Sequence, residues 1–182
     1  MSGGTGSDVT TDIQQLLLSR VHDIPDFPKP GVLFKDLNPL FADAAAFAAV
    51  LDHIASRWEG KVDMVGGIEA RGFIVGTPLA QRMGVGFLPV RKAGKLPGET
   101  ISQTYDLEYG TATVEVAKDA CRGKRVLLVD DVLATGGTAS ATAQLLQRAG
   151  AEVAGLEFLL EVAFLQGRAL LADHEISIVA QA

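Results

Sequence analysis

The sequence predicts an α/β fold, with a single domain whose mainly parallel central sheet is flanked by helices. Three observations support this prediction. Short apolar runs alternate with helical patterns over residues 62–179, the 182 residues amount to one domain, and a composition of 48 % hydrophobic and 21 % charged residues is globular. In parallel sheets ligands bind beyond the carboxyl ends of the strands. The residues that follow each apolar run are therefore the first candidates for a site.

The N-terminal part of the chain is expected to be less regular than the rest. Residues 1–10 are rich in Gly, Ser and Thr and predict a disordered tail, with the folded domain over 11–182. Apolar residues at helical spacing predict a helix over 12–21. Three prolines within residues 24–31 exclude a helix and predict an extended loop. An apolar stripe predicts a second helix over 43–58.

Strands and helices then alternate. Strands are expected at 62–67, 85–91, 111–117, 125–129, 151–160 and 175–179, and helices at 72–83, from the glycine loop to about 149, and at 164–171. The stretch 92–110 is polar, contains glycine and has no period, which predicts a small loop-rich subregion. Apolar runs separated by helices are typical of strands that are covered on both faces.

Charge and cysteine content exclude several classes of function. Sixteen basic and 22 acidic residues leave a net charge of −6, which argues against non-specific nucleic-acid binding, since that requires a basic surface. The single cysteine, Cys121, excludes a disulfide framework and a cysteine-based zinc site. Residues 1–8 lack a signal-peptide pattern, and the most apolar segment, 153–165, is too short for a bilayer. We expect a cytoplasmic protein without a nucleic-acid or membrane partner.

Three further side chains have no predicted role. Basic residues follow Cys121 and would lower its pKa, but the simpler expectation is a surface thiol without function. Glu157 and Glu161 lie in an apolar strand. Burial of either carboxylate would require a partner, which the sequence does not identify.

The most informative segment is 126–138, where a buried strand leads into two carboxylates, a loop of small residues and a helix start. The carboxylates are Asp130 and Asp131, and the loop consists of Ala134, Thr135, Gly136, Gly137 and Thr138. Glycine allows close approach of the backbone to a ligand, threonine adds hydroxyl donors, and the helix N-terminus adds free N–H groups. Together these features predict a phosphate-binding cup.

The same segment limits the class of ligand that the cup can bind. No lysine follows the glycines, which excludes the nucleoside-triphosphate loop, and the glycine spacing differs from that of dinucleotide-binding loops. Two aspartates beside a phosphate would repel it unless they face sugar hydroxyls or a divalent cation. We therefore favour binding of a phosphorylated sugar; a helix cap followed by a tight turn is the structural alternative.

Several segments together resemble one family. Residues 129–138 are similar to the 5-phosphoribosyl-1-pyrophosphate (PRPP) signature of type I phosphoribosyltransferases. The proline-rich segment 24–36, Glu69-Ala70-Arg71-Gly72-Phe73, the basic segment 90–98 and Tyr105-Asp106-Leu107-Glu108-Tyr109-Gly110 resemble the adenine-specific branch of that family. The resemblance extends from about residue 13 to the C-terminus. It implies the type I phosphoribosyltransferase fold, with a small hood over about 92–110.

The resemblance also implies a reaction and its ligands. In this family, Mg²⁺-bound PRPP and adenine give AMP and pyrophosphate. Residues 134–138 would hold the 5′-phosphate, and Asp130 and Asp131 the ribose hydroxyls. Mg²⁺ prefers oxygen ligands and keeps several waters, so we expect it on PRPP and water, with no ligand directly from the protein. A homodimer is implied in the same way.

Pyrophosphate would be held by basic side chains. By resemblance these are Arg71, Arg91, Lys92 and Lys95, some of which act across the dimer interface in the family. The family pattern also places a non-proline cis peptide at Glu69–Ala70 or Ala70–Arg71. The alternatives are a surface salt bridge for Arg71 and solvated loop cations for the others.

The base would be recognised by two parts of the chain. The resemblance assigns adenine binding to Leu33, Phe34 and Lys35, with Val132 on the opposite face of the ring; Lys35 stands where relatives commonly carry arginine. Glu108 matches the catalytic glutamate that contacts N7 of adenine, and residues 95–104 match the mobile part of the hood. Core packing for Phe34 and an exposed acid at a strand edge for Glu108 are the alternatives.

Two other functions stay open. A phosphoribosyltransferase for hypoxanthine, guanine, xanthine or orotate would share the phosphate cup, although the proline loop and Glu108 favour adenine. A non-catalytic sensor of PRPP or purines would reuse the fold, but such proteins typically append a DNA-binding segment, for which the first ten residues are too short. Fold alone would justify none of these functions.

Overall fold

The computed structural model describes the backbone of residues 6–106 and 110–182 and the side chains from residue 12 onward outside that gap. The chain forms two compact units, residues 1–53 and 54–182. The α/β fold with a mainly parallel sheet is confirmed, although many element boundaries differ from the expected ones. No helix in the described ranges is long and apolar enough to cross a membrane.

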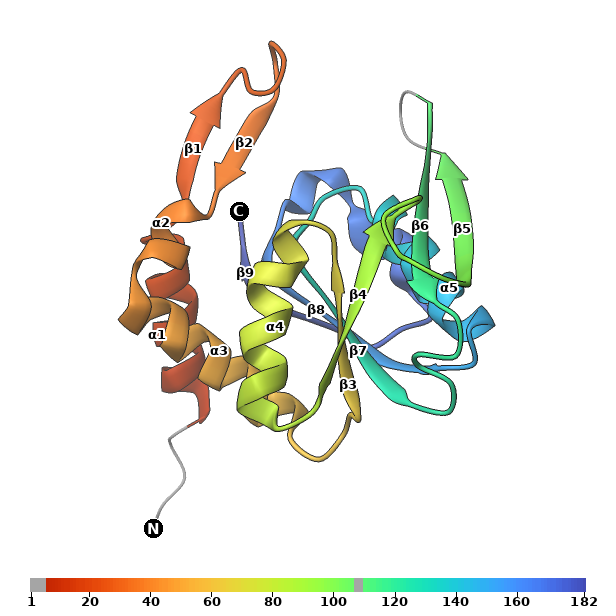
Figure 1. The fold of residues 1–182 in the computed structure, drawn as a ribbon. Coiled ribbons are helices and arrows are strands. Elements are labelled where there is room, and N and C mark those ends of the chain that lie inside the picture. The colour runs from red at the N-terminus through yellow and green to blue at the C-terminus, as the bar shows by residue number, and fades with distance from the viewer. Residues whose placement is uncertain (1–5, 107–109) are drawn as a thin grey trace. The chain divides into compact units, whose positions relative to one another are not determined.

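The N-terminal unit combines short helices with a hairpin (Figure 1). Its elements are α1 (Gly6–Leu18), β1 (His22–Pro25), β2 (Leu33–Asp36), α2 (Asn38–Ala42) and the first part of α3 (Ala44–Trp58). Helix α1 includes residues 6–10, which the composition had assigned to a disordered tail. Ser, Asp and Thr in that segment are residues that the first turn of a helix accepts well. Residues 1–5 lie outside the described part.

The proline-rich loop is the tip of this hairpin. Strands β1 and β2 pair antiparallel, with Ile24 opposite Phe34. The Asp26 carboxylate accepts a hydrogen bond from the Gly31 N–H at 2.8 Å, and the Phe27–Pro28 peptide is cis. The extended loop expected over 24–31 is thus bounded by two short strands, which pair over four residues each.

The C-terminal unit contains a seven-stranded sheet in the order β5-β6-β4-β3-β7-β8-β9. The strands are β3 (Met64–Ile68), β4 (Gly86–Lys92), β5 (Thr100–Asp106), β6 (Thr111–Ala117), β7 (Arg125–Leu133), β8 (Glu152–Glu161) and β9 (Ile176–Gln181). The neighbouring strands β4, β3, β7, β8 and β9 are parallel to one another. Strand β6 pairs antiparallel with β4, and β5 pairs antiparallel with β6.

Two helices cover this sheet. Helix α4 (Arg71–Met83) connects β3 to β4, and α5 (Gly137–Arg148) connects β7 to β8. Because the two crossovers run in opposite directions along the sheet, the right-handed rule places the helices on opposite faces, as Figure 1 shows. One core cluster lies between the sheet and α5 and includes Leu128, Leu145 and Phe158, which are all buried.

Three sequence expectations were wrong in detail. Strand β5 lies within 92–110, where no period was visible; only Ile101 and Tyr105 on its inner side are large and apolar, so pairing with β6 is what defines the strand. Residues 163–171 form two 3₁₀ turns in place of one helix, because Gln166 between them has a φ of 54°. Strand β7 continues to Leu133, so Asp130 and Asp131 lie within a paired strand and not in the loop after it.

Candidate active site

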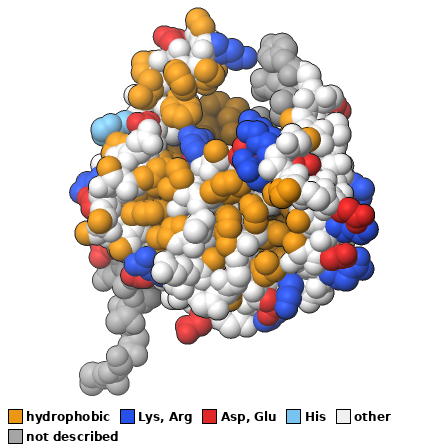
Figure 2. Space-filling view, in the orientation of Figure 1, with side chains coloured by type: hydrophobic (Ala, Val, Ile, Leu, Met, Phe, Trp, Pro, Cys, Tyr) orange, Lys and Arg blue, Asp and Glu red, His pale blue; other side chains and the backbone are white. Residues whose placement is uncertain are grey.

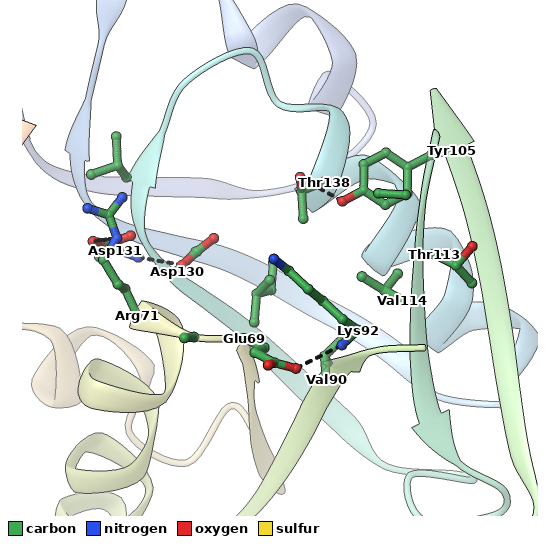
Figure 3. A pocket seen from close by; sticks show the side chains of 14 residues that line it. Glu69, Arg71, Val90, Lys92, Tyr105, Thr113, Val114, Asp130, Asp131 and Thr138 are labelled. Carbon is green, nitrogen blue, oxygen red and sulfur yellow. Dashed lines mark hydrogen bonds and ion pairs between the residues drawn. The ribbon is translucent and has the colours of Figure 1, made fainter. Parts of the chain in front are cut away.

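A pocket of about 340 Å³ lies at the carboxyl ends of β3, β4 and β7 (Figure 3). Its lining comes from the ends of parallel strands, from the start of α4 and α5, and from β5 and β6. The lining residues are Ile68, Glu69, Ala70, Arg71, Val90, Lys92, Tyr105, Ala112, Thr113, Val114, Asp130, Asp131, Val132 and Thr138. Six predicted site residues therefore meet in one cavity: Arg71, Lys92, Asp130, Asp131, Val132 and Thr138.

The predicted phosphate cup is a second, smaller hollow of about 90 Å³, which shares Asp130, Val132 and Thr138 with the first. All five residues from Ala134 to Thr138 line it. Gly136 precedes α5 with a φ of 82°, a conformation that side chains disfavour. The first N–H groups of α5 have no partner within the helix, so the cup supplies the backbone donors and positive helix end that an anion requires.

The backbone of this cup is supported from behind by the turn at Gly167. A Cβ on Gly136 would collide with the Gly167 carbonyl oxygen, and a Cβ on Gly167 would collide with that of Ala134. Glycine at both positions therefore permits direct backbone-to-backbone packing. The Arg168 guanidinium, bound to Glu161 at 2.9 Å, holds this turn to the end of β8.

The two adjacent aspartates point in different directions because successive residues of a strand face opposite sides of the sheet. Figure 3 shows Asp131 beside Arg71, and Asp130 turned toward the part of the pocket that holds Lys92. Asp131 Oδ2 lies 2.8 Å from Arg71 Nε, with Asp131 only 3 % exposed. Asp130 Oδ1 accepts the Asp131 N–H at 2.9 Å. The pair thus presents carboxylates on two sides of one strand end.

Burial makes both carboxylates harder to ionise. Burial raises the pKa of Asp130 well above its usual value, and the charge of Asp131 adds to this rise. Burial also raises the pKa of Asp131, although the Arg71 guanidinium partly opposes the effect. Two neighbouring carboxylates in a poorly hydrated site are stabilised by a bound ligand that donates hydrogen bonds or carries positive charge.

Arg71 reaches Asp131 because α4 begins close to β7. A Cβ on Gly72 would lie 2.8 Å from the Val129 carbonyl oxygen, so glycine allows this close approach. The peptide that leads into the helix, Glu69–Ala70, is cis, at one of the two positions that the resemblance implied. The Arg71 side chain is 41 % exposed and lines the pocket.

Glu69 holds the predicted basic residues together, a role the sequence did not indicate. Its carboxylate accepts the Lys92 N–H at 2.9 Å and lies 3.0 Å from Lys95 Nζ and 3.3 Å from Arg91 Nε. The hydrogen bond from the Lys92 N–H has the largest effect on the pKa of Glu69. Burial opposes this effect, the cations of Lys95 and Arg91 add to it, and the pKa is lowered to about 2. Arg91 and Lys95 thus bind Glu69, whereas Figure 3 shows the Lys92 side chain extending into the pocket.

Glu115 organises the loop that carries Lys95. Its Oε1 accepts the N–H groups of Lys95 and Leu96, each at 3.0 Å, and Thr100 binds Oε2 at 3.4 Å. Burial opposes ionisation of Glu115, but the N–H groups of the loop outweigh it and lower the pKa. Glu115 lies between two valines of β6, where no pattern in the sequence indicates a role for it. Its contact with the loop is visible only in the tertiary structure.

Apart from Val132, the residues predicted to bind and react with the base are not among the described residues that line the pocket. Leu33, Phe34 and Lys35 form β2 in the N-terminal unit, where Phe34 contacts the Phe27 ring edge-on at 5.1 Å between centroids and Lys35 binds Asp23 at 2.8 Å. Glu108 lies outside the described residues. Adenine binding by residues 33–35 and catalysis by Glu108 therefore stay predictions.

Three side chains left without a role are explained by their surroundings. Cys121 is completely buried, and burial raises the pKa of its thiol, so the expectation of a surface thiol was wrong. Glu157 accepts a hydrogen bond from Trp58 Nε1 at 2.7 Å. Glu161 binds Arg168 and accepts a hydrogen bond from Gln181 at 2.7 Å. Each donor comes from an element other than β8, and only the packing of these elements determines which donor reaches which carboxylate, which explains why the sequence did not identify them.

This chain is similar to known proteins both in sequence and in fold. The phosphoribosyl transferase domain model matches residues 36–168. An adenine phosphoribosyltransferase of Streptomyces coelicolor is 61 % identical over 163 residues, which are 88 % of this chain and 90 % of the relative. The crystal structure of adenine phosphoribosyltransferase from Thermoanaerobacter pseudethanolicus superimposes with a TM-score of 0.89 at 47 % identity, covering 93 % of this chain and 99 % of that one.

A further structure matches with ligands present. The enzyme of Saccharomyces cerevisiae, complexed with an imino-altritol bisphosphate and adenine, superimposes with a TM-score of 0.87 at 39 % identity, covering 93 % of this chain and 99 % of that one. The family match spans more than half of the 182 residues, and the relatives align over nearly the whole chain. By sequence and by fold, this protein belongs to the phosphoribosyl transferase domain family.

Proposed function

We propose that the protein is a purine-salvage enzyme that transfers the 5-phosphoribosyl group from PRPP to adenine, giving AMP and pyrophosphate. The observation that carries this proposal is the pocket in which Asp130, Asp131, Arg71, Lys92 and Thr138 meet. It adjoins the glycine cup at α5, so one continuous site offers separate places for a phosphate, a sugar and a second anionic group. Relatives with the matching name cover most of the chain.

The three anionic and polar parts of PRPP fit different walls of this site. The 5′-phosphate would occupy the cup of residues 134–138, where backbone N–H groups and the helix end are available. The ribose hydroxyls would donate to Asp130 and Asp131. The pyrophosphate would lie toward Arg71 and Lys92, with Arg91 and Lys95 released from Glu69 as further contacts.

The chemistry follows from this placement. The bond between C1′ and the pyrophosphate oxygen breaks, the electron pair leaves with pyrophosphate, and adenine N9 forms the new bond to C1′. Positive charge develops on the ribose during this exchange. Nearby carboxylates stabilise that charge, which assigns Asp130 and Asp131 an electrostatic role as well as a binding one. As N9 bonds to C1′, the proton on N7 of the base would pass to the Glu108 carboxylate; in the reverse direction Glu108 would donate it back to N7.

Mg²⁺ is proposed to enter with PRPP. The oxygen atoms of PRPP and of water are the ligands that Mg²⁺ prefers, and in the described ranges no group of three or more His, Cys, Asp and Glu side chains could hold a metal ion. This donor set fits a hydrated ion carried on the substrate better than a protein cage. When bound, the ion would neutralise charge on the leaving pyrophosphate.

The test is a pyrophosphate-release assay with Mg²⁺ and PRPP, in which adenine, hypoxanthine, guanine, xanthine and orotate are compared. We expect turnover with adenine alone, and its loss in Glu108→Ala. Glu99→Ala is the matched control, because Glu99 is a highly exposed acid that pairs with Lys118. Turnover with a 6-oxopurine or orotate would keep the PRPP site and contradict adenine selectivity; no turnover with any base would contradict the enzymatic proposal.

The same proposal includes a homodimer and a cytoplasmic location. Figure 2 shows hydrophobic side chains on the surface that α4 occupies in Figure 1, and Ile74 of α4 is 42 % exposed. An exposed apolar surface of this kind favours association, which supports the dimer that the resemblance implied. Light scattering of the purified protein and cell fractionation test the two statements separately.

A further inference from the structure

Tyr105 makes a contact that the predicted roles leave unexplained. Its hydroxyl donates a hydrogen bond to Thr138 Oγ1 at 3.0 Å, between β5 and the first turn of α5 (Figure 3). Both residues line the pocket, and Thr138 also lines the phosphate cup. The Tyr105 ring is partly buried and packs against the core cluster between the sheet and α5, which restricts the positions that its hydroxyl can take.

The direction of this hydrogen bond determines what Thr138 can do. A threonine hydroxyl has one donor and two acceptor positions. When Tyr105 occupies an acceptor position, the Thr138 proton is left to donate elsewhere, and the oxygen is kept at a fixed position on the wall of the cup. A threonine without this neighbour could rotate to another χ1 rotamer, in which its hydroxyl would no longer face the cup.

We propose that Tyr105 is a positioning residue for the 5′-phosphate, because it orients the Thr138 hydroxyl as a donor into the cup. This inference rests on the proposed function, since it takes residues 134–138 to be the site of the PRPP 5′-phosphate. It adds a residue from β5, within the predicted hood, to a phosphate site that the sequence confined to one loop.

A second tether between the same two elements provides a control. At the other end of α5, Arg148 donates to the Gln103 side chain at 2.5 Å and to the Ser102 carbonyl oxygen at 3.2 Å. Strand β5 is thus tied to α5 at two points, only one of which touches the cup. If Tyr105 merely anchors the strand, loss of the Arg148 tether has the same consequence as loss of the Tyr105 hydroxyl.

The experiment measures the Kd of ribose 5-phosphate by calorimetry, and the KM of PRPP and of adenine, in Tyr105→Phe, Arg148→Met and the wild type. Ribose 5-phosphate carries the 5′-phosphate and lacks the pyrophosphate, so its affinity reports on the cup without turnover. We expect Tyr105→Phe to weaken ribose 5-phosphate binding and raise the PRPP KM about 3- to 10-fold, the range of one hydrogen bond. Arg148→Met and the KM of adenine should be unaffected.

Thr138 variants test whether Tyr105 acts through that residue. In a Thr138→Val background Tyr105→Phe should have no further effect, whereas in Thr138→Ser, which keeps the hydroxyl, the effect should return. A Tyr105→Phe affinity equal to that of the wild type, an equal loss in Arg148→Met, or an undiminished loss in the Thr138→Val background would each overturn the inference. The Thr138 comparison also decides the matter if thermal unfolding shows that Tyr105→Phe is destabilised.

Failure of the proposed function is recognised separately. If the wild type binds ribose 5-phosphate but makes no AMP from adenine and PRPP, the enzymatic proposal fails while the role of Tyr105 is still measured by calorimetry. If adenine turnover is normal and Tyr105→Phe changes neither the Kd of ribose 5-phosphate nor the KM of PRPP, only the inference about Tyr105 fails.

Discussion

Adjacent strands β7 and β8 each carry two carboxylates in their second halves, but the two pairs have different surroundings. The strands are parallel, with Val129 opposite Glu157 and Leu133 opposite Glu161. On β7, Asp130 and Asp131 line the pocket, and Asp131 pairs with the partly exposed Arg71. The β8 carboxylates are both buried within the fold.

The difference lies in the donors. Glu157 accepts from Trp58, and Glu161 accepts from Arg168 and Gln181, so both β8 carboxylates are satisfied by side chains of the folded chain. The β7 pair is buried as well but faces a cavity; a raised pKa does not set it apart, because burial also raises the pKa of Glu157. Burial by itself therefore does not distinguish a structural carboxylate from a functional one; what distinguishes them is whether the fold or a ligand completes their hydrogen bonding.

Asp131→Asn should have the largest effect on activity. Loss of one preorganised charge that stabilises the transition state reduces turnover about 100- to 1,000-fold. The variant should unfold at the same or a higher temperature than the wild type, because one of two neighbouring buried charges is gone. Steady-state rates and thermal unfolding measure the two effects. Wild-type turnover, or unfolding at a clearly lower temperature, would place Asp131 with the structural carboxylates of β8.

Gly167→Ala tests whether the turn at Gly167, which follows β8, supports the cup of residues 134–138, which follows β7. The new Cβ would collide with the Ala134 carbonyl oxygen and lie 3.1 Å from the Gly136 nitrogen, neither of which can rotate away. We expect the free energy of unfolding to fall by about 1–3 kcal/mol, as for other overpacked sites, together with a raised PRPP KM.

Gly86→Ala is the matched control for this change. The nearest atoms to its new Cβ belong to the Met64 side chain, at 3.5 and 3.7 Å, an ordinary contact distance. This variant should keep the wild-type stability and PRPP KM. An unchanged PRPP KM in Gly167→Ala would show that the turn at Gly167 is only structural.

Trp58→Phe should act on stability and not on chemistry. It removes the indole N–H that Glu157 accepts, and a buried acceptor without its donor costs about 1–3 kcal/mol. Turnover per folded molecule should be unchanged. In a Glu157→Gln background the loss should be smaller, because no charge is then left without its donor; equal losses in both backgrounds would show that Trp58 contributes only through packing.

The smallest expected effect is on the pH dependence of stability. Burial raises the pKa of Glu157 above its ordinary value of 4.5, against the hydrogen bonds from Trp58 and Ser177. The folded state therefore holds this proton more tightly than the unfolded chain, so the stabilisation is complete below about pH 4.5 and is lost as pH rises through the raised pKa.

Glu157→Gln removes this titration. Denaturant unfolding at a series of pH values should show the variant gaining stability relative to the wild type as pH rises above 4.5. A constant difference across the series would mean that Glu157 titrates alike in the folded and unfolded chain, which would contradict its burial as the cause.

The sequence identified the local parts of this molecule well. The alternation of apolar runs with helices predicted the α/β class because burial on two faces requires such runs. The hollow at residues 134–138 could be predicted because its glycine backbone, threonine hydroxyls and helix start all lie within one short segment; phosphate binding there stays a prediction. Arg71 and Lys92 were predicted as pyrophosphate contacts from short segments that resemble the family, and the structure brings both to the pocket; their binding role stays a prediction.

Only the tertiary structure decided the features that depend on residues far apart in the chain. The donors to Glu157 and Glu161, the binding of three basic residues to Glu69, the burial of Cys121 and the contact of Tyr105 with Thr138 all join separate elements. Strand β5 is defined by pairing with β6 and not by an apolar pattern of its own. A sequence pattern reports what a segment buries and how its backbone turns, whereas the partner that satisfies a polar group is determined by how the segments pack.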